Sequence, residues 1–195
     1  IQLRDKVSST RALIELGRSL LAITRPAGVP LIVNDRVDVA LAIDADGVHV
    51  GQDDMPAPLA RRLLGPERIL GVSAGTVEEA LSAVERFAPD LVIMDVRLPD
   101  GSGIDAIPEI QASAFPPEII IITAFSDRDG AQTALKSGVW DYIEKPARID
   151  TLRLSLKRAL QYRGQKRTLE EPLSTERNGI IGESANLLMC ITLMA

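Results

Sequence analysis

The chain reads Asp90-Leu-Val-Ile-Met-Asp95 at one point, Ile119-Ile-Ile-Ile-Thr123 at a second, and Val139-Trp-Asp-Tyr-Ile-Glu-Lys145 at a third. Each apolar run ends at a polar residue of a different kind: the acid Asp95, the hydroxyl of Thr123 and the amine of Lys145. Short apolar runs that alternate with helical patterns predict buried parallel strands in βα units. Ligands bind outside the carboxyl ends of such strands, so these three groups are expected at one edge of one sheet.

This trio suits phosphoryl transfer. A carboxylate can accept a phosphoryl group as a nucleophile, while an amine and a hydroxyl can bind the phosphoryl oxygens. Asp95 precedes Thr123 by 28 positions (123 − 95) and Lys145 by 50 (145 − 95). With Pro99, Gly101 and Gly103 in place, the stretch resembles the receiver domain of bacterial response regulators.

The receiver resemblance implies a role for each polar residue. Asp95 would be the phosphoacceptor, Thr123 the switch hydroxyl and Lys145 the phosphate-contacting lysine. Tyr142 resembles the switch aromatic residue, with simple packing as an equal alternative. The implied phosphoryl source is a histidine kinase or a small phosphodonor.

Composition bounds the class of protein. The 195 residues, 46% apolar and 25% charged, suffice for one large or two small globular domains. A net charge of −5 favours neither a nucleic-acid nor a membrane partner. No apolar run has the length of a membrane span, no signal-peptide pattern opens the chain, and Cys190 is the single cysteine. A cytoplasmic location is expected.

The N-terminal part predicts further βα units. The expected strands are Ile1–Arg4, Val29–Val33, Gly47–Val50 and Ile69–Val72, and the expected helices run from about Ser8 to Arg25, Val37 to Ile43, Pro58 to Leu64 and Val77 to Phe87. Thr76 and Glu79 match a capping box before the last of these helices. His49, the only histidine, lies mid-strand, which favours packing over catalysis.

Residues 1–76 carry a second resemblance. The motifs are Gln2-Leu-Arg4-Asp-Lys6, Asn34-Asp35-Arg-Val-Asp38, Asp46-Gly-Val-His-Val-Gly51-Gln-Asp53-Asp54 and Gly71-Val-Ser73. In this order they resemble thiamine-phosphate synthase, a family of (β/α)₈ barrels. The resemblance implies substrate binding by Gln2, Arg4, Lys6, Asn34 and Ser73, and Mg²⁺ held at the pyrophosphate by Asp35 and Asp54.

The synthase pattern is incomplete. The family's first strand and its later Thr-Gly and Gly-Gly loops have no counterpart, although a barrel of this kind builds its site from the loops of all eight strands. We therefore expect that the chain is not an enzyme. The alternative is residual phosphate and Mg²⁺ binding at this barrel remnant, without turnover.

The receiver pattern is incomplete too, because the family's first strand, which ends in an acidic pair that holds Mg²⁺, is missing. Asp53 and Asp54 lie after the strand Gly47–Val50 and can stand in for that pair, since Asp54 precedes Asp95 by 41 positions (95 − 54). The predicted Mg²⁺ ligands are Asp53, Asp54 and Asp95. The two resemblances overlap over about residues 47–83.

Together these features predict an engineered chimera with an α/β fold built on a parallel βα-repeat sheet. The favoured architecture is flavodoxin-like and doubly wound, with extra N-terminal βα units from the barrel fragment, and Gly47–Val50 then lies between Ile69–Val72 and Leu91–Met94. The alternative is a sequential, barrel-like sheet, in which Gly47–Val50 pairs with both Leu31–Val33 and Ile69–Val72. The expected segments are 1–76, 77–163 and 164–195.

The C-terminal part predicts a helix from Ile149 to about Arg163, with leucines at 152, 156 and 160, whose exposed face suits a homodimer. Gly164–Glu176 reads as a linker. Gly179–Ser184 resembles the opening of the ATPase domain of enhancer-binding response regulators, but no G-x-x-x-x-G-K-[ST] loop occurs, so ATP binding is not expected. Leu187–Ala195 is apolar and predicts either a helix or a self-association segment.

Overall fold

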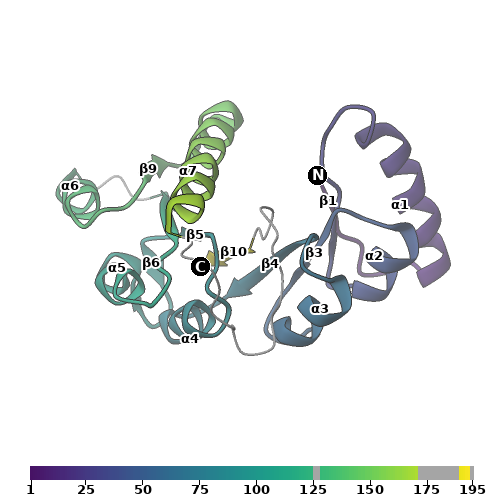
Figure 1. Cartoon of the computed structure of the whole chain (residues 1–195), viewed down its shortest axis with the longest axis horizontal. Coiled ribbons are helices and arrows are strands. Elements are labelled where there is room, and N and C mark those ends of the chain that lie inside the picture. Colours follow the sequence, from purple (N-terminus) through teal and green to yellow (C-terminus); the bar gives the residue numbers. More distant parts are fainter. Residues whose placement is uncertain (125–127, 171–188, 194–195) are drawn as a thin grey trace. The chain divides into compact units, whose positions relative to one another are not determined.

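The computed structural model describes residues 1–124, 128–170 and 189–193, which fall into two compact units (Figure 1). Unit 1 is Ile1–Ser73, and the described part of unit 2 is residues 74–170 and 189–193. Over these residues, no helix is long and apolar enough to cross a membrane.

Unit 1 is a run of parallel βα repeats. Its elements are β1 (Gln2–Leu3), α1 (Thr10–Thr24), β2 (Ile32–Asn34), α2 (Val37–Ile43), β3 (Gly47–Val50), α3 (Ala57–Leu64) and β4 (Ile69–Ala74), the last residue of which belongs to unit 2. The strands pair in the order β1-β2-β3-β4. Figure 1 shows α1, α2 and α3 following one another along one side of these strands.

One row of side chains forms the core of unit 1. Leu3, Val33, Val48 and Leu70 are neighbours in the strand register and are at most 6% exposed. Because side chains alternate along a strand, the residues between them face the other way. Gln2, Asn34, His49 and Ser73 therefore share the opposite face of the sheet.

The position of β3 differs from the favoured prediction. β3 pairs with β2 and β4, as in the barrel-like alternative, and does not lie beside Leu91–Met94. Local hydrogen bonds explain this choice: the Asp46 carboxylate accepts from the Leu31 amide at 2.7 Å, and the Asp46 carbonyl accepts from the Ile69 amide at 2.9 Å. One residue at the start of β3 thus fixes both neighbours.

Unit 2 is also built mainly from parallel strands and helices. Its elements are α4 (Val77–Phe87), β5 (Leu91–Met94), the hairpin β6 (Arg97–Leu98) and β7 (Gly101–Ser102), α5 (Gly103–Gln111), β8 (Glu118–Thr123), α6 (Arg128–Lys136), β9 (Asp141–Glu144), α7 (Ile149–Glu170) and β10 (Met189–Leu193). Its parallel strands run in the order β10-β5-β8-β9. The α/β class with parallel strands, predicted from the apolar runs, is confirmed.

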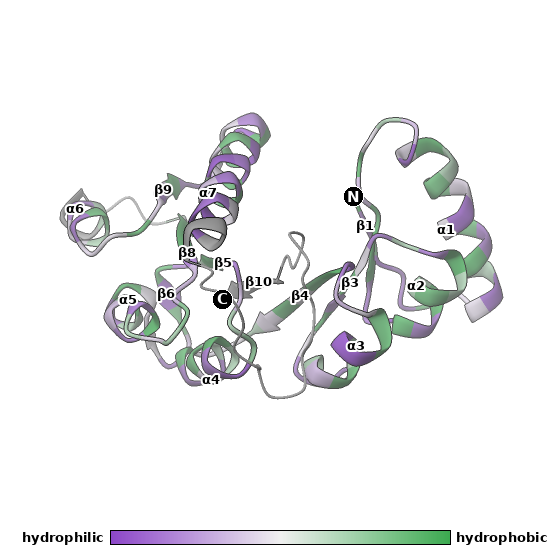
Figure 2. Cartoon of the chain, viewed as in Figure 1, coloured by the Kyte–Doolittle hydropathy of each residue, from purple (hydrophilic) through white to green (hydrophobic). Residues whose placement is uncertain are grey.

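The sheet of unit 2 has helices on both faces. Val92, Met94, Ile119 and Ile121 pack with residues of α4 and α5 such as Ala83. On the other face, Leu91, Ile120 and Ile143 pack against Ala159 and the leucines of α7. Figure 2 shows helices that change from hydrophilic to hydrophobic around their circumference, as such packing requires. Unit 2 is therefore doubly wound.

The C-terminal part departs from its prediction in two places. Helix α7 continues to Glu170, so the first residues of the expected linker are helical. Met189–Leu193, expected as a helix or a self-association segment, forms strand β10 beside β5. The motif at Gly179–Ser184 lies outside the described residues.

Candidate functional site

The three polar groups predicted at the strand ends of unit 2 meet. The Lys145 Nζ lies 2.8 Å from the Asp95 Oδ2, and the Thr123 hydroxyl also hydrogen-bonds the Asp95 carboxyl. Asp95 follows β5, Thr123 is the last residue of β8, and Lys145 follows β9. Because these strands are neighbours in one parallel sheet, all three residues lie at the same edge. The site is half-open: the side chain of Asp95 is 10% exposed and that of Lys145 is 44% exposed.

The electrostatics keep Asp95 ionised. Burial alone would raise the pKa of this carboxyl, but the hydrogen bonds from Lys145, the Arg97 amide and Thr123, together with the Lys145 charge, outweigh burial and lower the pKa. The Asp95 Oδ1 accepts a hydrogen bond of 3.4 Å from the Arg97 amide. An ionised carboxylate oxygen suits a nucleophile.

Gly103 lets the loop after Asp95 close against the strand. Its amide donates to the Val96 carbonyl at 2.8 Å, and a Cβ there would lie 2.3 Å from the Asp95 carbonyl oxygen.

Tyr142 is partly buried and packs against the core of unit 2. The peptide bond between Lys145 and Pro146 is cis.

Unit 1 assembles a second polar cluster. The carboxyl of Asp35 interacts with that of Asp54, and the charges of Lys6 and Arg4 act on Asp35. Burial, followed by the hydrogen bond and charge of Asp54, raises the pKa of Asp35. Asp35 has a φ of 64°, a region that few non-glycine residues occupy and that is often found at functional sites.

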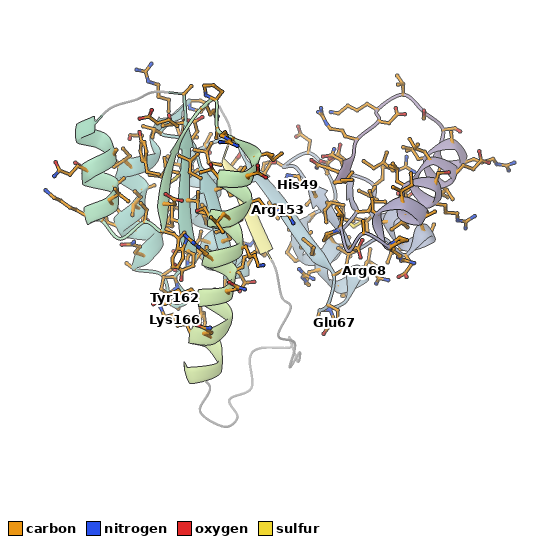
Figure 3. All side chains as sticks on the ribbon, turned by 90° about the horizontal axis from the view of Figure 1, so that it is seen from above. His49, Glu67, Arg68, Arg153, Tyr162 and Lys166 are labelled. Atoms are coloured by element: carbon orange, nitrogen blue, oxygen red, sulfur yellow. The ribbon has the colours of Figure 1, made fainter. Side chains whose placement is uncertain are left out.

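The remaining residues predicted for the barrel site lie on the sheet face opposite the helices of unit 1. The Gln2 Nε2 donates to the Asn34 Oδ1 at 2.8 Å. The Ser73 hydroxyl is 2.7 Å from the His49 Nε2, and the Ser73 carbonyl accepts from the Gln52 side chain at 2.6 Å. Figure 3 labels His49, which is half-buried, and burial lowers its pKa.

The residues of the predicted receiver metal set belong to two units. Asp53 and Asp54 are in unit 1, where the Asp54 Oδ2 accepts from the Gly51 amide at 2.8 Å and Asp53 is exposed, and Asp95 is in unit 2. Over residues 1–124, 128–170 and 189–193, no three His, Cys, Asp or Glu side chains are grouped to hold a metal ion. Within unit 1, the Asp35 and Asp54 pair offers two hard oxygen ligands of the kind that Mg²⁺ prefers.

Sequence reasoning missed a buried ion pair at the opposite end of the sheet of unit 2. Asp90 and Arg163 are 4% and 6% exposed, their Oδ1 and Nε atoms are 3.9 Å apart, and the Arg163 Nη1 donates to the Pro116 carbonyl at 2.8 Å. The sequence signal that could have revealed it is the spacing on the helix: Arg163 continues the buried stripe formed by the leucines at 152, 156 and 160.

On the same helix, the ring of Tyr162, labelled in Figure 3, lies 5.3 Å from that of Trp140, measured between the ring centroids.

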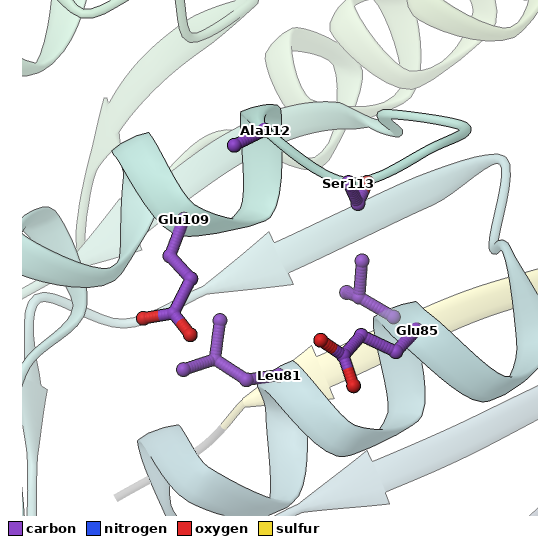
Figure 4. Close-up of a pocket in the computed structure, with 6 residues that line it drawn as sticks. Leu81, Glu85, Glu109, Ala112 and Ser113 are labelled. Atoms are coloured by element: carbon purple, nitrogen blue, oxygen red, sulfur yellow. The ribbon is translucent and has the colours of Figure 1, made fainter.

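A small pocket lies between α4 and α5. Figure 4 shows Glu85 and Glu109 reaching into it beside Leu81 and near Ser113. None of the residues predicted as functional lines it, so it is separate from the Asp95 site.

Comparison with known families finds two matches. The chain matches the family described as Thiamine monophosphate synthase over residues 1–94 and the family described as Response regulator receiver domain over residues 52–157. Residues 52–94 match both. The predicted composite of these two families is confirmed.

Individual relatives agree. The thiamine-phosphate synthase of Roseiflexus sp. (strain RS-1) is 62% identical over 96 residues, which are 49% of this chain and 41% of that protein. The structure of the Pyrococcus furiosus thiamine phosphate pyrophosphorylase is 35% identical, with a TM-score of 0.51 over 73% of this chain and 70% of that one. The receiver domain of a Vibrio parahaemolyticus protein described as a Luxo repressor is 27% identical, with a TM-score of 0.50 over 73% of this chain and 98% of that one.

These matches correct one prediction. The expectation that the chain is not an enzyme is wrong in the light of its relatives, because the proteins that match its N-terminal half belong to an enzyme family, at 62% identity in the Roseiflexus case. The chain spans about two fifths of the length of that synthase.

Proposed function

Because this chain belongs to both the response regulator receiver family and the thiamine-phosphate synthase family, we propose that each of its two units handles phosphate with the residues of its own family. Phosphoryl acceptance at Asp95 is the function that the geometry favours most. The contact between Lys145 and Asp95, with Thr123 on the same carboxyl, is the observation that supports it.

The reaction at Asp95 is a displacement at phosphorus. An ionised carboxylate oxygen attacks the phosphorus atom of the donor, a new O–P bond forms, and the bond to the donor's leaving group breaks with its electron pair. The Lys145 ammonium and the Thr123 hydroxyl then bind the phosphoryl oxygens. A histidine kinase in the cytoplasm is the cellular donor that this role favours, and a small phosphodonor replaces it in the test tube.

Incubation with acetyl phosphate, read by intact mass, tests this role. We expect the mass of one phosphoryl group on the parent chain and none on Asp95→Asn. Lys145→Ala is expected to slow labelling by roughly tenfold to a thousandfold, because one charged contact to the transferred group is lost. Lys157→Ala, an exposed lysine of α7, is the matched control and should label like the parent. Equal labelling of Asp95→Asn and the parent would contradict the proposal.

Diphosphate binding of the synthase type is the second function, located in unit 1. The interaction of the Asp35 and Asp54 carboxyls with each other, and of Asp35 with the charges of Lys6 and Arg4, supports it. Two carboxyls held together fit Mg²⁺, which would neutralise the charge of a bound diphosphate. Arg4 and Lys6 would attract the phosphate oxygens, while Gln2, Asn34 and Ser73 present hydrogen-bonding groups on the same sheet face.

Titration calorimetry with inorganic pyrophosphate tests unit 1. We expect binding that requires Mg²⁺ in the parent chain and is lost in Asp54→Asn, with Asp38→Asn as a control that keeps binding. Turnover of the synthase substrates is the enzymatic readout of the same site. Binding that survives in Asp54→Asn would contradict the assignment.

A further inference from the structure

We infer that the edge of β5 opposite β8 is a strand-docking site, filled here by β10 and able to accept the same segment from a second copy of the chain. The observation that carries this inference is the pairing of a strand from the far end of the described chain with the central strand of unit 2.

The pairing is regular. Cys190, Ile191, Thr192 and Leu193 lie opposite Leu91, Val92, Ile93 and Met94 in a parallel ladder. On its other side, β5 pairs with β8 in an equally regular register. β5 is thus hydrogen-bonded along both edges, as a central strand should be.

The site requires an occupant. Leu91, Val92 and Met94 are at most 2% exposed, so β5 is an apolar strand buried on both faces. Without β10, one edge of this strand would present unpaired amide and carbonyl groups along an apolar segment, which is a template for another strand. A five-residue parallel strand fits this edge, and its register is set by its own sequence.

The connection permits exchange. β5, β8 and β9 follow one another through the helices of unit 2, whereas residues 171–188 join α7 to β10. At about 3.3–3.6 Å per residue, a chain of that length can reach at most roughly 60 Å, which allows docking on its own β5 or on that of a neighbour. Opening a single short strand requires less free energy than unfolding the unit.

A second copy is the occupant that fits. An identical chain presents the identical segment, so reciprocal exchange reproduces every pair of the ladder and closes a symmetric dimer. No new contact at the strand is needed, because each β5 receives the same residues that it receives from its own chain.

A pair of cysteines tests the exchange. Cys190, the only cysteine in the sequence, lies opposite Leu91, and neighbouring strands have a spacing suited to a disulfide. One chain supplies the β5 edge and is called the slot chain; it carries Leu91→Cys with Cys190→Ser. The other chain supplies β10 and is called the strand chain; it is the parent, which keeps Cys190. The two are mixed, incubated at rising concentration, oxidised and separated without reductant.

We expect a disulfide-linked heterodimer whose yield rises with protein concentration. The slot chain alone should give no dimer, and a strand chain with Ile191→Pro, which loses a ladder donor, should give little. In the Leu91→Cys chain that keeps Cys190, an intrachain disulfide should dominate at low concentration.

Two results would overturn the inference. An intrachain disulfide without any heterodimer in the mixture would mean that β10 does not exchange. Failure of both cross-links in a folded sample would mean that β10 does not occupy the site. If Leu91→Cys prevents folding, Val92→Cys in the slot chain and Ile191→Cys with Cys190→Ser in the strand chain repeat the test one register position along.

Discussion

The Nζ of Lys145 lies 2.8 Å from the Oδ2 of Asp95, although 50 residues separate them in the chain. The contact forms because β5 and β9 flank β8 in one parallel sheet, so the polar residues after each strand arrive at the same edge. It also sets the charge of the site, because the lysine helps to keep a largely buried carboxyl ionised.

Replacing Lys145 by alanine should destabilise unit 2 and change its acid sensitivity. The folded pKa of Asp95 is lowered, so its contribution to stability is present above the ordinary aspartate pKa and is lost as pH falls through the folded value. Without Lys145 that pKa rises, and the loss begins at higher pH. We expect a cost of about 1 kcal/mol at neutral pH, since the lysine is partly exposed. Urea unfolding followed by Trp140 fluorescence measures both effects, and an unchanged pH profile would contradict this account.

Replacing Asp35 by asparagine should stabilise unit 1. The folded pKa of Asp35 is raised by burial and by Asp54, so its contribution is present below the ordinary aspartate pKa and is lost as pH rises through the folded value. At neutral pH the ionised group opposes folding, and asparagine also tolerates the φ of 64°. A gain of about 1 kcal/mol is expected, measured by hydrogen exchange at the Val33 and Val48 amides.

Asp38→Asn is the matched control for Asp35→Asn. A hydrogen bond from Arg36, opposed by burial, lowers the pKa of Asp38, so loss of this largely exposed charge should destabilise unit 1 slightly, by about 0.2–1 kcal/mol. If the two substitutions changed the free energy of unfolding equally, the interaction between the Asp35 and Asp54 carboxyls would not be what destabilises unit 1 at neutral pH.

Gly103→Ala should damage unit 2 and its labelling. The new Cβ would lie 2.3 Å from the Asp95 carbonyl oxygen and 2.9 Å from the Met94 Cγ, so the loop must move, at a cost of about 1–3 kcal/mol. Gly164→Ala in α7 meets nothing within 4 Å and should stabilise the helix by about 1 kcal/mol. The thermal unfolding temperatures of the two variants are compared with that of the parent. If Gly103→Ala left this temperature unchanged, the close approach of Gly103 to the Asp95 carbonyl oxygen would be refuted.

His49 should make unit 1 sensitive to mild acid. Its folded pKa is lowered by burial, with a small opposing effect of Asp54, so its contribution to stability is present above the ordinary histidine pKa and is lost as pH falls through the folded value. Because it is the only histidine in the sequence, hydrogen exchange between about pH 7 and pH 5 isolates its effect. His49→Gln should make the stability of unit 1 less dependent on pH in this range. If the variant kept the pH dependence of the parent, His49 would not be its source.

The sequence allowed prediction of the features that depend on residues close together in the chain. Strands ending in Asp95, Thr123 and Lys145 could be predicted because apolar runs identify buried strands and parallel topology places their ends together. The cap at Thr76 was correct in the same way: the Thr76 hydroxyl accepts from the Glu79 amide at 3.2 Å. The Glu79 carboxylate also reaches back, but it accepts from the amide of Gly75 at 2.6 Å, one residue before the N-cap.

Non-local pairing could not be predicted. The run Met189–Leu193 suits a helix or a strand equally well, and its partner β5 lies about a hundred residues earlier in the sequence. The place of β3 depended on the hydrogen bonds of Asp46, which a sequence pattern does not reveal. The burial of Arg163 with Asp90 was not predicted, because burial of a charged pair depends on both partners.

The most direct test of the two phosphate sites is a labelling time course with acetyl phosphate and Mg²⁺ on the parent, Asp95→Asn and Asp54→Asn chains. The contact of Asp54 with Asp35 lies within unit 1, and the contact of Asp95 with Lys145 lies within unit 2. We predict that the parent and Asp54→Asn are labelled at the same rate and that Asp95→Asn is not labelled. Loss of labelling in Asp54→Asn would contradict this assignment, because Asp54 would then serve both sites.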